Sequence, residues 1–282
     1  MKGYTMNYVF SNLNFAIFGL DGIDLNEEFQ SFRTEDISNP NCNIKIIYTD
    51  TIKDIQRKPV FYGERSFLIY NTLKGESRIF LEYYSGNRIA MLEDYGDQKT
   101  LWLLNKKQWS EKRLLNCLAL EKTMNELGRI ILHASFIETE KGAVLFTAPS
   151  GTGKSTQAEL WNKYRGTEII NGDRASIWKY KNKWWAGGIP WSGTSGITKN
   201  KKMPLKAIVI LKQGSENKVN ILPVITKLKY LLEQTTINPW NQQMLLRSQE
   251  ILTQVCMEVP ILQLSCRPDR ESVEVLAKEL GR

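Results

Sequence analysis

The sequence predicts an α/β (α+β) protein with a β-rich domain at residues 1–105 and a mixed-sheet domain at residues 106–282. Three observations carry this prediction. Short runs that alternate apolar and polar residues fill the first domain, as expected for strands with one solvated face. Strands and helices alternate in the second domain, around one glycine-rich loop. A turn at 138–142 makes the strand before that loop antiparallel to its predecessor, which indicates a mixed sheet.

The first domain consists of predicted strands and contains no chemical motif. The strands cover residues 7–18, 43–48, 65–71, 77–84 and 87–92, with turns at 73–75 and 85–87. We expect such a domain to leave a sheet edge to which an extended peptide can add through backbone hydrogen bonds. It is therefore predicted to recognise a peptide, with Arg65, Arg78 and Arg88 attracting an acidic one.

The second domain is predicted to begin with a helix and two strands. Ser110 is a candidate cap for a helix at residues 111–127, whose apolar stripe ends before Gly128. Residues 129–137 and 142–147 have the apolar character of buried strands. The turn between these strands makes them a hairpin, which lies directly ahead of the glycine-rich loop.

Residues 148–156 read Ala-Pro-Ser-Gly-Thr-Gly-Lys-Ser-Thr and match a phosphate-binding P-loop (Walker A) between a strand and a helix. Backbone N–H groups around Gly151 and Gly153 can surround an anion, and the following helix presents its positive end to it. Lys154 is placed to contact the β- and γ-phosphates, and the Ser155 hydroxyl to bind Mg²⁺. The predicted nucleotide-binding residues are Ser150, Gly151, Thr152, Gly153, Lys154, Ser155 and Thr156.

Ala148 stands where the P-loop pattern has its first glycine, and alanine allows the same close approach at a negative φ. The alternative for this stretch is a surface turn rich in glycine and hydroxyl side chains. Because the strand, the loop and the helix follow at the spacing that a P-loop requires, we expect ATP and Mg²⁺ to bind here. Lys154, at the junction of loop and helix, is expected to be exposed.

The segment after the P-loop helix supplies a carboxylate and a second glycine-rich loop. A short strand at 167–170 leads to Asp173, and a P-loop enzyme needs a carboxylate for Mg²⁺ at the end of such a strand. Residues 187–196 contain four glycines and a Pro-Trp pair. We expect Trp191 and Ser192 in this loop to contact substrate, and a plain turn is the alternative. The rest is predicted as strands at 175–180, 183–186, 205–211 and 261–264 and helices at 223–235, 240–257 and 269–280.

Composition limits the partners and the compartment. The net charge of +8 favours anionic ligands, but no long basic block points to nucleic acid. The four cysteines are widely spaced and the chain has one histidine, so we expect free thiols and no zinc site. No run approaches the roughly 18 apolar residues of a membrane span, and polar residues interrupt the N-terminus where a signal peptide would be apolar. We therefore predict a cytoplasmic protein without a membrane partner, and the sequence is compatible with a homo-oligomer.

Three motifs, in order, resemble the HPr kinase/phosphorylase family, which shares its P-loop fold with phosphoenolpyruvate carboxykinase. They are Leu-His-Ala-Ser at 132–135, Ser-Gly-Thr-Gly-Lys-Ser at 150–155 and Asn-Gly-Asp-Arg at 171–174. The resemblance covers about residues 110–282 and is closest to the HPr-kinase-like peptide serine kinases of lasso-peptide and related peptide-modification systems. It implies an ATP-dependent serine kinase for a peptide or small protein, with His133 at the place of the family's histidine. A carboxykinase is much larger and uses an additional metal-binding histidine, whereas this chain has a single histidine.

Two segments depart from the family. Gly172 replaces the first aspartate of the family's pair, so Asp173 is left for both the metal and the base. The segment at 190–196 has neither the acidic nor the arginine residue that HPr kinases carry, and reverse phosphorolysis is therefore not implied.

The predicted catalytic residues are Asp173, His133 and Lys154, with Ser155 and Asp173 as ligands of the metal. Either Asp173 or His133 could be the base, because imidazole groups exchange protons near neutral pH. His133 could equally be a structural residue of its strand. Arg174 could meet a substrate phosphate or form a salt bridge.

Three classes of function are compatible with these residues. The leading one is ATP-dependent transfer of the γ-phosphoryl group to a serine hydroxyl of a peptide or small protein. The second is a nucleotide-binding accessory protein of a peptide-maturation system with altered or lost phosphoryl transfer, which Gly172 favours. The third is a small-molecule kinase or a carboxykinase-like enzyme. Mass spectrometry of candidate peptides incubated with the protein and Mg-ATP would separate the first class from the others.

Overall fold

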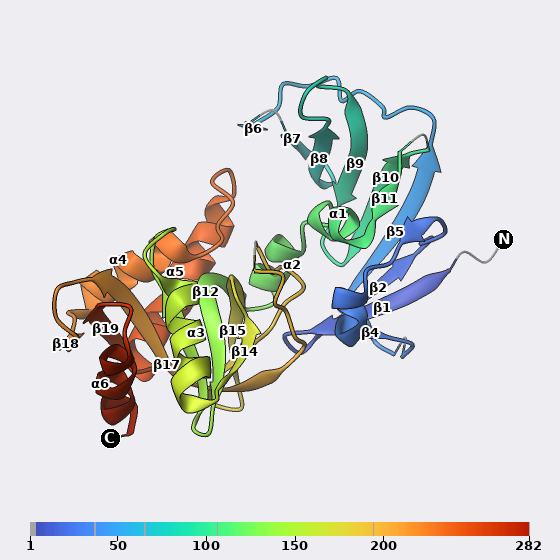
Figure 1. The fold of residues 1–282 in the computed structure, drawn as a ribbon. Helices are drawn as coiled ribbons and strands as arrows, with labels where there is room; N and C mark the ends of the chain where they lie inside the picture. The colour runs from blue at the N-terminus through green and yellow to red at the C-terminus, as the bar shows by residue number, and fades with distance from the viewer. Residues whose placement is uncertain (1–3, 37, 65, 106, 194, 282) are drawn as a thin grey trace. The chain divides into compact units, whose positions relative to one another are not determined.

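The computed structural model describes residues 4–36, 38–64, 66–105, 107–193 and 195–281, and the chain divides into two compact units, Met1–Thr123 and Met124–Arg282. Each unit has its own large sheet (Figure 1). The boundary expected from the sequence, between residues 105 and 106, lies earlier in the chain. Among the described residues, no helix combines the length and the apolar character that spanning a membrane requires.

The first unit contains a mixed sheet of nine strands within its described residues. They are β1 (Thr5–Phe10), β2 (Leu13–Phe18), β4 (Arg33–Thr34), β5 (Cys42–Thr49), β6 (Phe61–Gly63), β7 (Phe67–Thr72), β8 (Gly75–Leu81), β9 (Arg88–Asp94) and β10 (Gln98–Leu104). Their order is β4-β1-β2-β5-β10-β9-β8-β7-β6. Strand β5 runs parallel to both neighbours, and the other pairs are antiparallel. The short strands β3 (Ile23–Asp24) and β11 (Trp109–Ser110) pair with each other, and a 3₁₀-helix covers Glu27–Phe32.

The predicted strand at residues 7–18 is two strands, β1 and β2, joined by a tight turn at Ser11 and Asn12. These residues have φ angles of 54° and 60°. Two consecutive positive φ angles are the conformation of a two-residue hairpin turn of type I′, and asparagine tolerates it better than most residues. The strand β10 was not predicted.

Two of the three arginines expected to attract an acidic peptide lie in the described residues, and both have carboxylate partners. Arg78 is buried, with ion pairs to Glu76 at 2.6 Å and to Glu121 at 2.7 Å. The expectation is therefore wrong for Arg78, which is not available to a ligand at the surface. Arg88 is partly exposed and forms an ion pair with Asp54 at 2.7 Å. Arg65 lies outside the described residues.

The predicted helix at 111–127 is interrupted. It consists of α1 (Glu111–Asn116) and α2 (Leu120–Glu126). The Ser110 hydroxyl caps α1 by accepting a hydrogen bond from the backbone N–H of Arg113, so the predicted cap is confirmed. Ala119, directly before the second helix, has a φ of 50°, a left-handed conformation that one continuous helix could not contain.

The second unit contains a mixed sheet of eight strands within its described residues, so the mixed sheet predicted for the second domain is confirmed. The strands are β12 (Arg129–Thr139), β13 (Gly142–Thr147), β14 (Glu168–Asn171), β15 (Arg174–Tyr180), β16 (Lys183–Gly187), β17 (Lys202–Gln213), β18 (Lys218–Ile221) and β19 (Ile261–Cys266). The antiparallel hairpin of β12 and β13 is present, and β13 then pairs in parallel with β17. The first half of β12 pairs with β15 and its second half with β13. The pairings therefore close a ring, β13-β12-β15-β16-β17.

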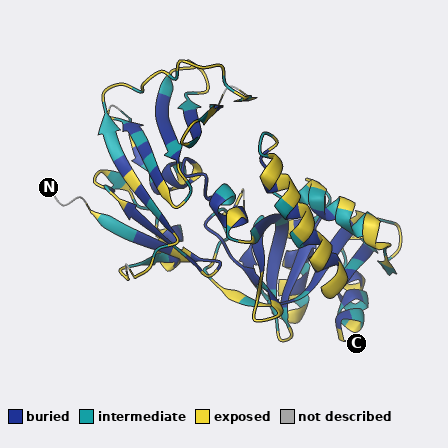
Figure 2. Cartoon of the chain, turned by 180° about the vertical axis from the view of Figure 1, so that it is seen from behind, coloured by how far each residue is buried: buried dark blue, intermediate teal, exposed yellow. Residues whose placement is uncertain are grey.

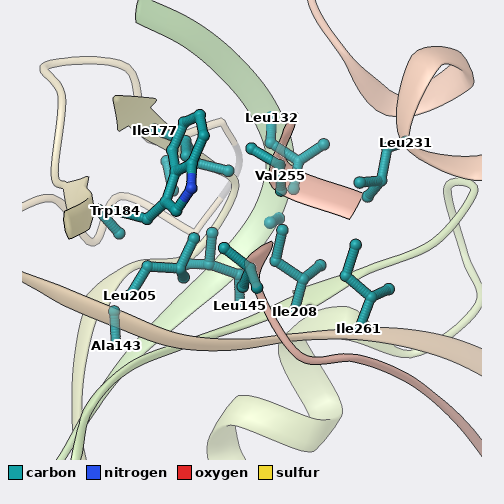
Figure 3. Close-up of a cluster of buried hydrophobic side chains, with 14 of the residues drawn as sticks. Leu132, Ala143, Leu145, Ile177, Trp184, Leu205, Ile208, Leu231, Val255 and Ile261 are labelled. Atoms are coloured by element: carbon teal, nitrogen blue, oxygen red, sulfur yellow. The ribbon is translucent and has the colours of Figure 1, made fainter. Parts of the chain in front are cut away.

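Helices cover two faces of this sheet. They are α3 (Lys154–Arg165), α4 (Val224–Gln234), α5 (Gln242–Glu258) and α6 (Arg270–Gly281). On β13, Val144 and Phe146 pack with α3 and α6, whereas Ala143 and Leu145 pack in the cluster that includes α4 and α5 (Figure 3). The strands are buried while the outer faces of the helices are exposed (Figure 2). This packing fixes the end of β13, from which the glycine-rich loop departs.

Candidate active site

Residues 148–153 join β13 to α3 in a glycine-rich loop that leads directly into the N-terminus of the helix. Gly151 and Gly153 have φ angles of 77° and 115°, in the left-handed region that favours glycine. Gly153 is the cap residue of α3 and provides no side-chain hydrogen bond. The N–H groups of the first helical turn therefore have no capping side chain, and the positive end of the helix dipole adds to their attraction for an anion.

Lys154 is buried, at 8% exposure, contrary to the expectation from its place at the junction of loop and helix. Its Nζ donates to the backbone oxygens of Ala148 at 2.9 Å and Pro149 at 3.3 Å. Burial lowers the pKa of Lys154 below its ordinary value, and the negative charge of Asp173 opposes that shift. A phosphate in the loop would offer Nζ a charged acceptor in place of two neutral carbonyls, and charge-assisted hydrogen bonds are the stronger kind.

The pairing of β12 with β15 brings a histidine and a carboxylate together. His133 is opposite Arg174 in the register, and the N–H of Ala134 donates to the backbone oxygen of Asp173 at 2.9 Å. His133 Nε2 lies 2.9 Å from Asp173 Oδ1, and Arg174 Nε lies 3.2 Å from Asp173 Oδ2. The hydrogen bond with His133 lowers the pKa of Asp173, burial opposes this, and Arg174 lowers it further. Asp173 is therefore a carboxylate at neutral pH.

Asn171 holds the turn that carries Asp173, and the sequence placed it in the Asn-Gly-Asp-Arg motif without predicting a role for it. It is fully buried. Its Oδ1 accepts hydrogen bonds from the backbone N–H groups of Asp173 and Arg174, both at 2.9 Å. Its Nδ2 donates to the backbone oxygens of Ile189 and Trp191, both at 3.0 Å. One amide thus fastens the turn to the glycine-rich loop at 187–196, and an asparagine directly before Gly-Asp was the available signal.

The turn that carries Asp173 and the glycine-rich loop at 187–196 are so close that two positions require glycine. A Cβ at Gly172 would lie 2.2 Å from Ser195 Oγ. A Cβ at Gly193 would lie 2.6 Å from Asp173 Cγ, and Gly193 has a φ of 57°. Ser135 Oγ donates to the backbone oxygen of Gly172 at 2.9 Å, which fixes the turn from the β12 side. The Ser195 hydroxyl therefore occupies the space that a side chain at position 172 would need.

One cavity of about 300 Å³ gathers the predicted catalytic residues. It is lined by His133, Ser150, Gly151, Gly153, Lys154, Ser155, Thr156, Gly172, Asp173 and Ser195. The P-loop residues form one side of it. His133, Gly172, Asp173 and Ser195 are joined by the contacts described above, and we name them the acceptor side.

Three residues were predicted to contact substrate, and none of them is among the described residues that line this cavity. Arg174 is partly exposed and pairs with Asp173. Trp191 is half-buried, and Ser192 is only 2% exposed. In the same loop, Ser195 is exposed and lines the cavity, although the sequence did not single it out. Contacts of Arg174, Trp191 and Ser192 with a substrate stay predictions.

A second cavity, of about 310 Å³, lies on another side of the P-loop. It is lined by Gly151, Thr152, Gly153, Thr156, Gln157, Leu211, Gln213, Gly214, Cys266, Arg267 and Pro268. Gly151, Gly153 and Thr156 line both cavities. A ligand with phosphates in the P-loop can therefore extend into this second cavity, where Leu211 and Pro268 offer apolar surface.

The residues present fit a magnesium ion that is shared with a nucleotide. Among the described residues, no group of three or more histidine, cysteine and acidic side chains could hold a metal alone. Ser155 and Asp173 line the same cavity and provide one hydroxyl and one carboxylate. Proteins usually bind Mg²⁺ through one or two carboxylates together with substrate phosphates and water. This donor set therefore suits Mg²⁺ bound with a nucleotide rather than a resident metal.

Comparison with known proteins does not identify a family for this chain. No protein-family model and no curated protein matches the chain. Among solved structures, the HPr(Ser) kinase/phosphatase from Coxiella burnetii is similar, at 14% identity and a TM-score of 0.31 over 53% of this chain and 94% of that chain. A likeness at this identity and TM-score does not assign the chain to a family.

Proposed function

We propose that this chain is an ATP-dependent kinase that transfers the γ-phosphoryl group to a serine hydroxyl of a peptide or small protein. The observation that carries the proposal is the single cavity shared by the P-loop, Lys154, Ser155 and the His133–Asp173 pair. We place this activity in a peptide-modification system of the lasso-peptide kind. The serine acceptor and that system rest on the resemblance of the sequence motifs.

Phosphoryl transfer needs positioning and charge neutralisation more than covalent chemistry. In this chain, the N–H groups at the start of α3 would bind the phosphate chain, and Lys154 Nζ would exchange its carbonyl partners for phosphate oxygens. The nucleoside would extend into the second cavity, which shares the P-loop glycines. Ser155 and Asp173 would hold Mg²⁺, which when bound neutralises charge on the phosphates.

The acceptor hydroxyl would enter from the acceptor side of the cavity. Asp173 is ionised at neutral pH, so its carboxylate can take the proton from a serine hydroxyl. His133 Nε2 is hydrogen-bonded to Asp173 Oδ1 and thereby orients that carboxylate. We therefore assign the base to Asp173 and a positioning role to His133.

The experiment is incubation of the protein with Mg-ATP and a library of serine-containing peptides, followed by mass spectrometry. We expect ADP and peptides heavier by one phosphoryl group. Lys154→Ala should abolish both products with the fold intact, as judged by circular dichroism, because the variant loses the cation that contacts the phosphates. ATP affinity and turnover equal to those of the parent in this variant would exclude the P-loop assignment. Nucleotide binding by the parent without any phosphorylated peptide would favour an accessory protein instead, the alternative that Gly172 in place of an aspartate favours.

A further inference from the structure

A hydroxyl of the chain itself lies on the acceptor side of the cavity. Ser195 lines the same cavity as Lys154, Ser155 and Asp173. The other hydroxyl side chains that line the cavity, Ser150, Ser155 and Thr156, belong to the P-loop and the first turn of α3. Ser195 belongs to the loop that contacts Gly172 and Asp173.

This placement matters because phosphoryl transfer is an in-line displacement. The attacking oxygen must approach the γ-phosphorus from the side opposite to the leaving oxygen. The P-loop holds the β-phosphate, which carries the leaving oxygen. An attacking hydroxyl must therefore come from the acceptor side, and Ser195 provides a hydroxyl there among the described residues.

The hydrogen bonds of Ser195 leave its oxygen able to act as a nucleophile. Its Oγ donates to the backbone oxygen of Ser192 at 2.8 Å and accepts from the N–H of Ile197 at 3.3 Å. A hydroxyl oxygen has two lone pairs, so one lone pair has no partner among these bonds.

Two glycines lie close to Ser195 in the loop. Gly193 and Gly196 have φ angles of 57° and 66°, and glycine crosses between left- and right-handed regions at little cost. A Cβ at Gly196 would meet open space.

We propose that Ser195 is a phosphorylation site of the chain itself, modified within the same molecule from ATP bound at its own P-loop. The proposal rests on the kinase function proposed above. In the step, Ser195 Oγ forms a bond to the γ-phosphorus as the bond from that phosphorus to the β–γ bridging oxygen breaks. ADP leaves with the electron pair of that bond, and the hydroxyl proton, released from its hydrogen bond to the backbone oxygen of Ser192, passes to the Asp173 carboxylate. The products are phosphoserine at position 195 and ADP.

The test is incubation of the full chain with Mg-ATP labelled at the γ-phosphate, without any added acceptor, followed by acid quench and peptide mapping. We expect up to one phosphoryl group per chain, on the peptide that contains Ser195. The fraction labelled at a given time should stay constant over a tenfold range of protein concentration, because the transfer is intramolecular. Ser195→Ala should reduce the label to background, and Ser195→Thr should move it to threonine. Ser85→Ala is the matched control that retains the label, since Ser85 is also an exposed serine followed by glycine but lies in the other unit.

Other outcomes overturn the proposal in distinguishable ways. Phosphorylation of added peptides with no label at Ser195 would refute self-modification and leave the kinase function standing. Label that persists in a folded Ser195→Ala variant would place the acceptor elsewhere. A fraction labelled that rises with protein concentration would show transfer between molecules. Failure of the parent chain to bind a fluorescent ATP analogue would refute the kinase function and this proposal together.

Discussion

At the scale of single residues, the chemistry of the site depends on Asp173, because both of its carboxylate oxygens have side-chain hydrogen-bond partners. Oδ1 contacts His133 and Oδ2 contacts Arg174. The backbone of Asp173 is held separately, by Asn171 on one side and by β12 on the other. A change confined to the carboxylate should therefore alter its chemistry while the turn keeps its place.

Asp173→Asn should lower kcat by about 10²–10⁴-fold, the usual contribution of a general base, while the affinity for ATP changes little. The backbone and Lys154 still hold the nucleotide, so the loss falls on the transition state. His133→Ala should cost less, because in our assignment it only orients the carboxylate. The measurements are kcat from ADP release and the Kd of a fluorescent ATP analogue for each variant. A folded Asp173→Asn enzyme within a few fold of the parent would remove Asp173 from both roles, and a larger loss in His133→Ala would make histidine the base.

Cys266 lines the second cavity, and the reactivity of its thiol can be measured without any catalytic turnover. It is half-buried and its Sγ accepts a hydrogen bond from Gln157 Nε2 at 3.3 Å, whereas the other three cysteines are buried. Burial raises the pKa of the Cys266 thiol. It raises the pKa of Cys117 to about 12. Alkylation of the folded protein should therefore occur at Cys266 first, and faster as the pH rises toward the thiol's raised pKa.

Mg-ATP should slow this alkylation, because the nucleoside part would cover Cys266 in the second cavity. Tripolyphosphate with Mg²⁺ is the matched control: it can fill the P-loop but has no nucleoside, so it should protect less. The measurement is the rate of iodoacetamide labelling at each cysteine by mass spectrometry. Equal protection by both ligands, or none by Mg-ATP, would remove the nucleoside from this cavity.

At the scale of elements, the start of α2 is bound to the first sheet by buried charges. The Asp94 carboxylate is fully buried at the end of β9 and pairs with Lys99 at 2.6 Å and with Lys122 at 2.9 Å. Burial alone would raise the pKa of Asp94, but the two ammonium groups outweigh it and lower the pKa below its ordinary value. A carboxyl with a lowered folded pKa stabilises the fold above its unfolded pKa of about 3.9. That contribution is lost as the pH falls through the folded pKa.

Asp94→Asn should destabilise the first unit by about 3–5 kcal/mol at neutral pH, because two ammonium groups remain near an uncharged amide. The variant should also lose the part of the acid dependence of stability that Asp94 causes. The measurement is urea unfolding at pH 7 and at several values below pH 5. Asp54→Asn is the matched control: that carboxylate pairs with Arg88 in an exposed position, so its loss should cost under about 1 kcal/mol. Equal costs for the two variants would contradict the account of the buried cluster.

Elements defined by neighbouring residues were predicted well from the sequence. The helices α4, α5 and α6 begin and end within two residues of the predicted ranges, because their apolar stripes repeat at helical spacing. The hairpin of β12 and β13 follows from its turn. The order of the first sheet was not predictable in this way, since β5 pairs with strands distant in the chain. The break at Ala119 was missed because the apolar stripe continues across it.

The site shows the same division between local and distant contacts. The P-loop and Asp173 are recognisable because strand, turn and helix carry their own signals. The role of Asn171 and the position of Ser195 depend on the contact of the turn with the loop that follows β16. No local pattern encodes that contact, so the sequence pointed to Trp191 and Ser192 while the structure places Ser195 in the cavity. The burial of Lys154 was missed although its hydrogen-bond partners are carbonyls of its own loop.

At the scale of the whole molecule, the lining residues of the first cavity and those of the second all lie in the unit Met124–Arg282. The helix α2 crosses the boundary at Thr123: Lys122 pairs with a carboxylate of the first sheet, whereas Asn125 donates to Ser248 of the second unit. A fragment that begins at Ser110 keeps α1 and α2 entire, whereas one that begins at Met124 cuts through α2. The longer fragment is therefore the suitable one for separating the functions of the two units.

A fragment of residues 110–282 should bind Mg-ATP with an affinity close to that of the full chain, because it retains both cavities. It should lose most of its affinity for a peptide substrate, since we expect the β-rich region to hold an extended peptide by adding it to a sheet edge. The measurements are fluorescence titrations with an ATP analogue and with a labelled peptide that the full chain phosphorylates. A cooperative thermal transition that shifts upward with Mg-ATP is the control for folding, because a ligand that binds only the folded state stabilises it. Peptide affinity that survives in a folded fragment would instead assign recognition to the loop at 187–196, in which Gly193 lies close to Asp173.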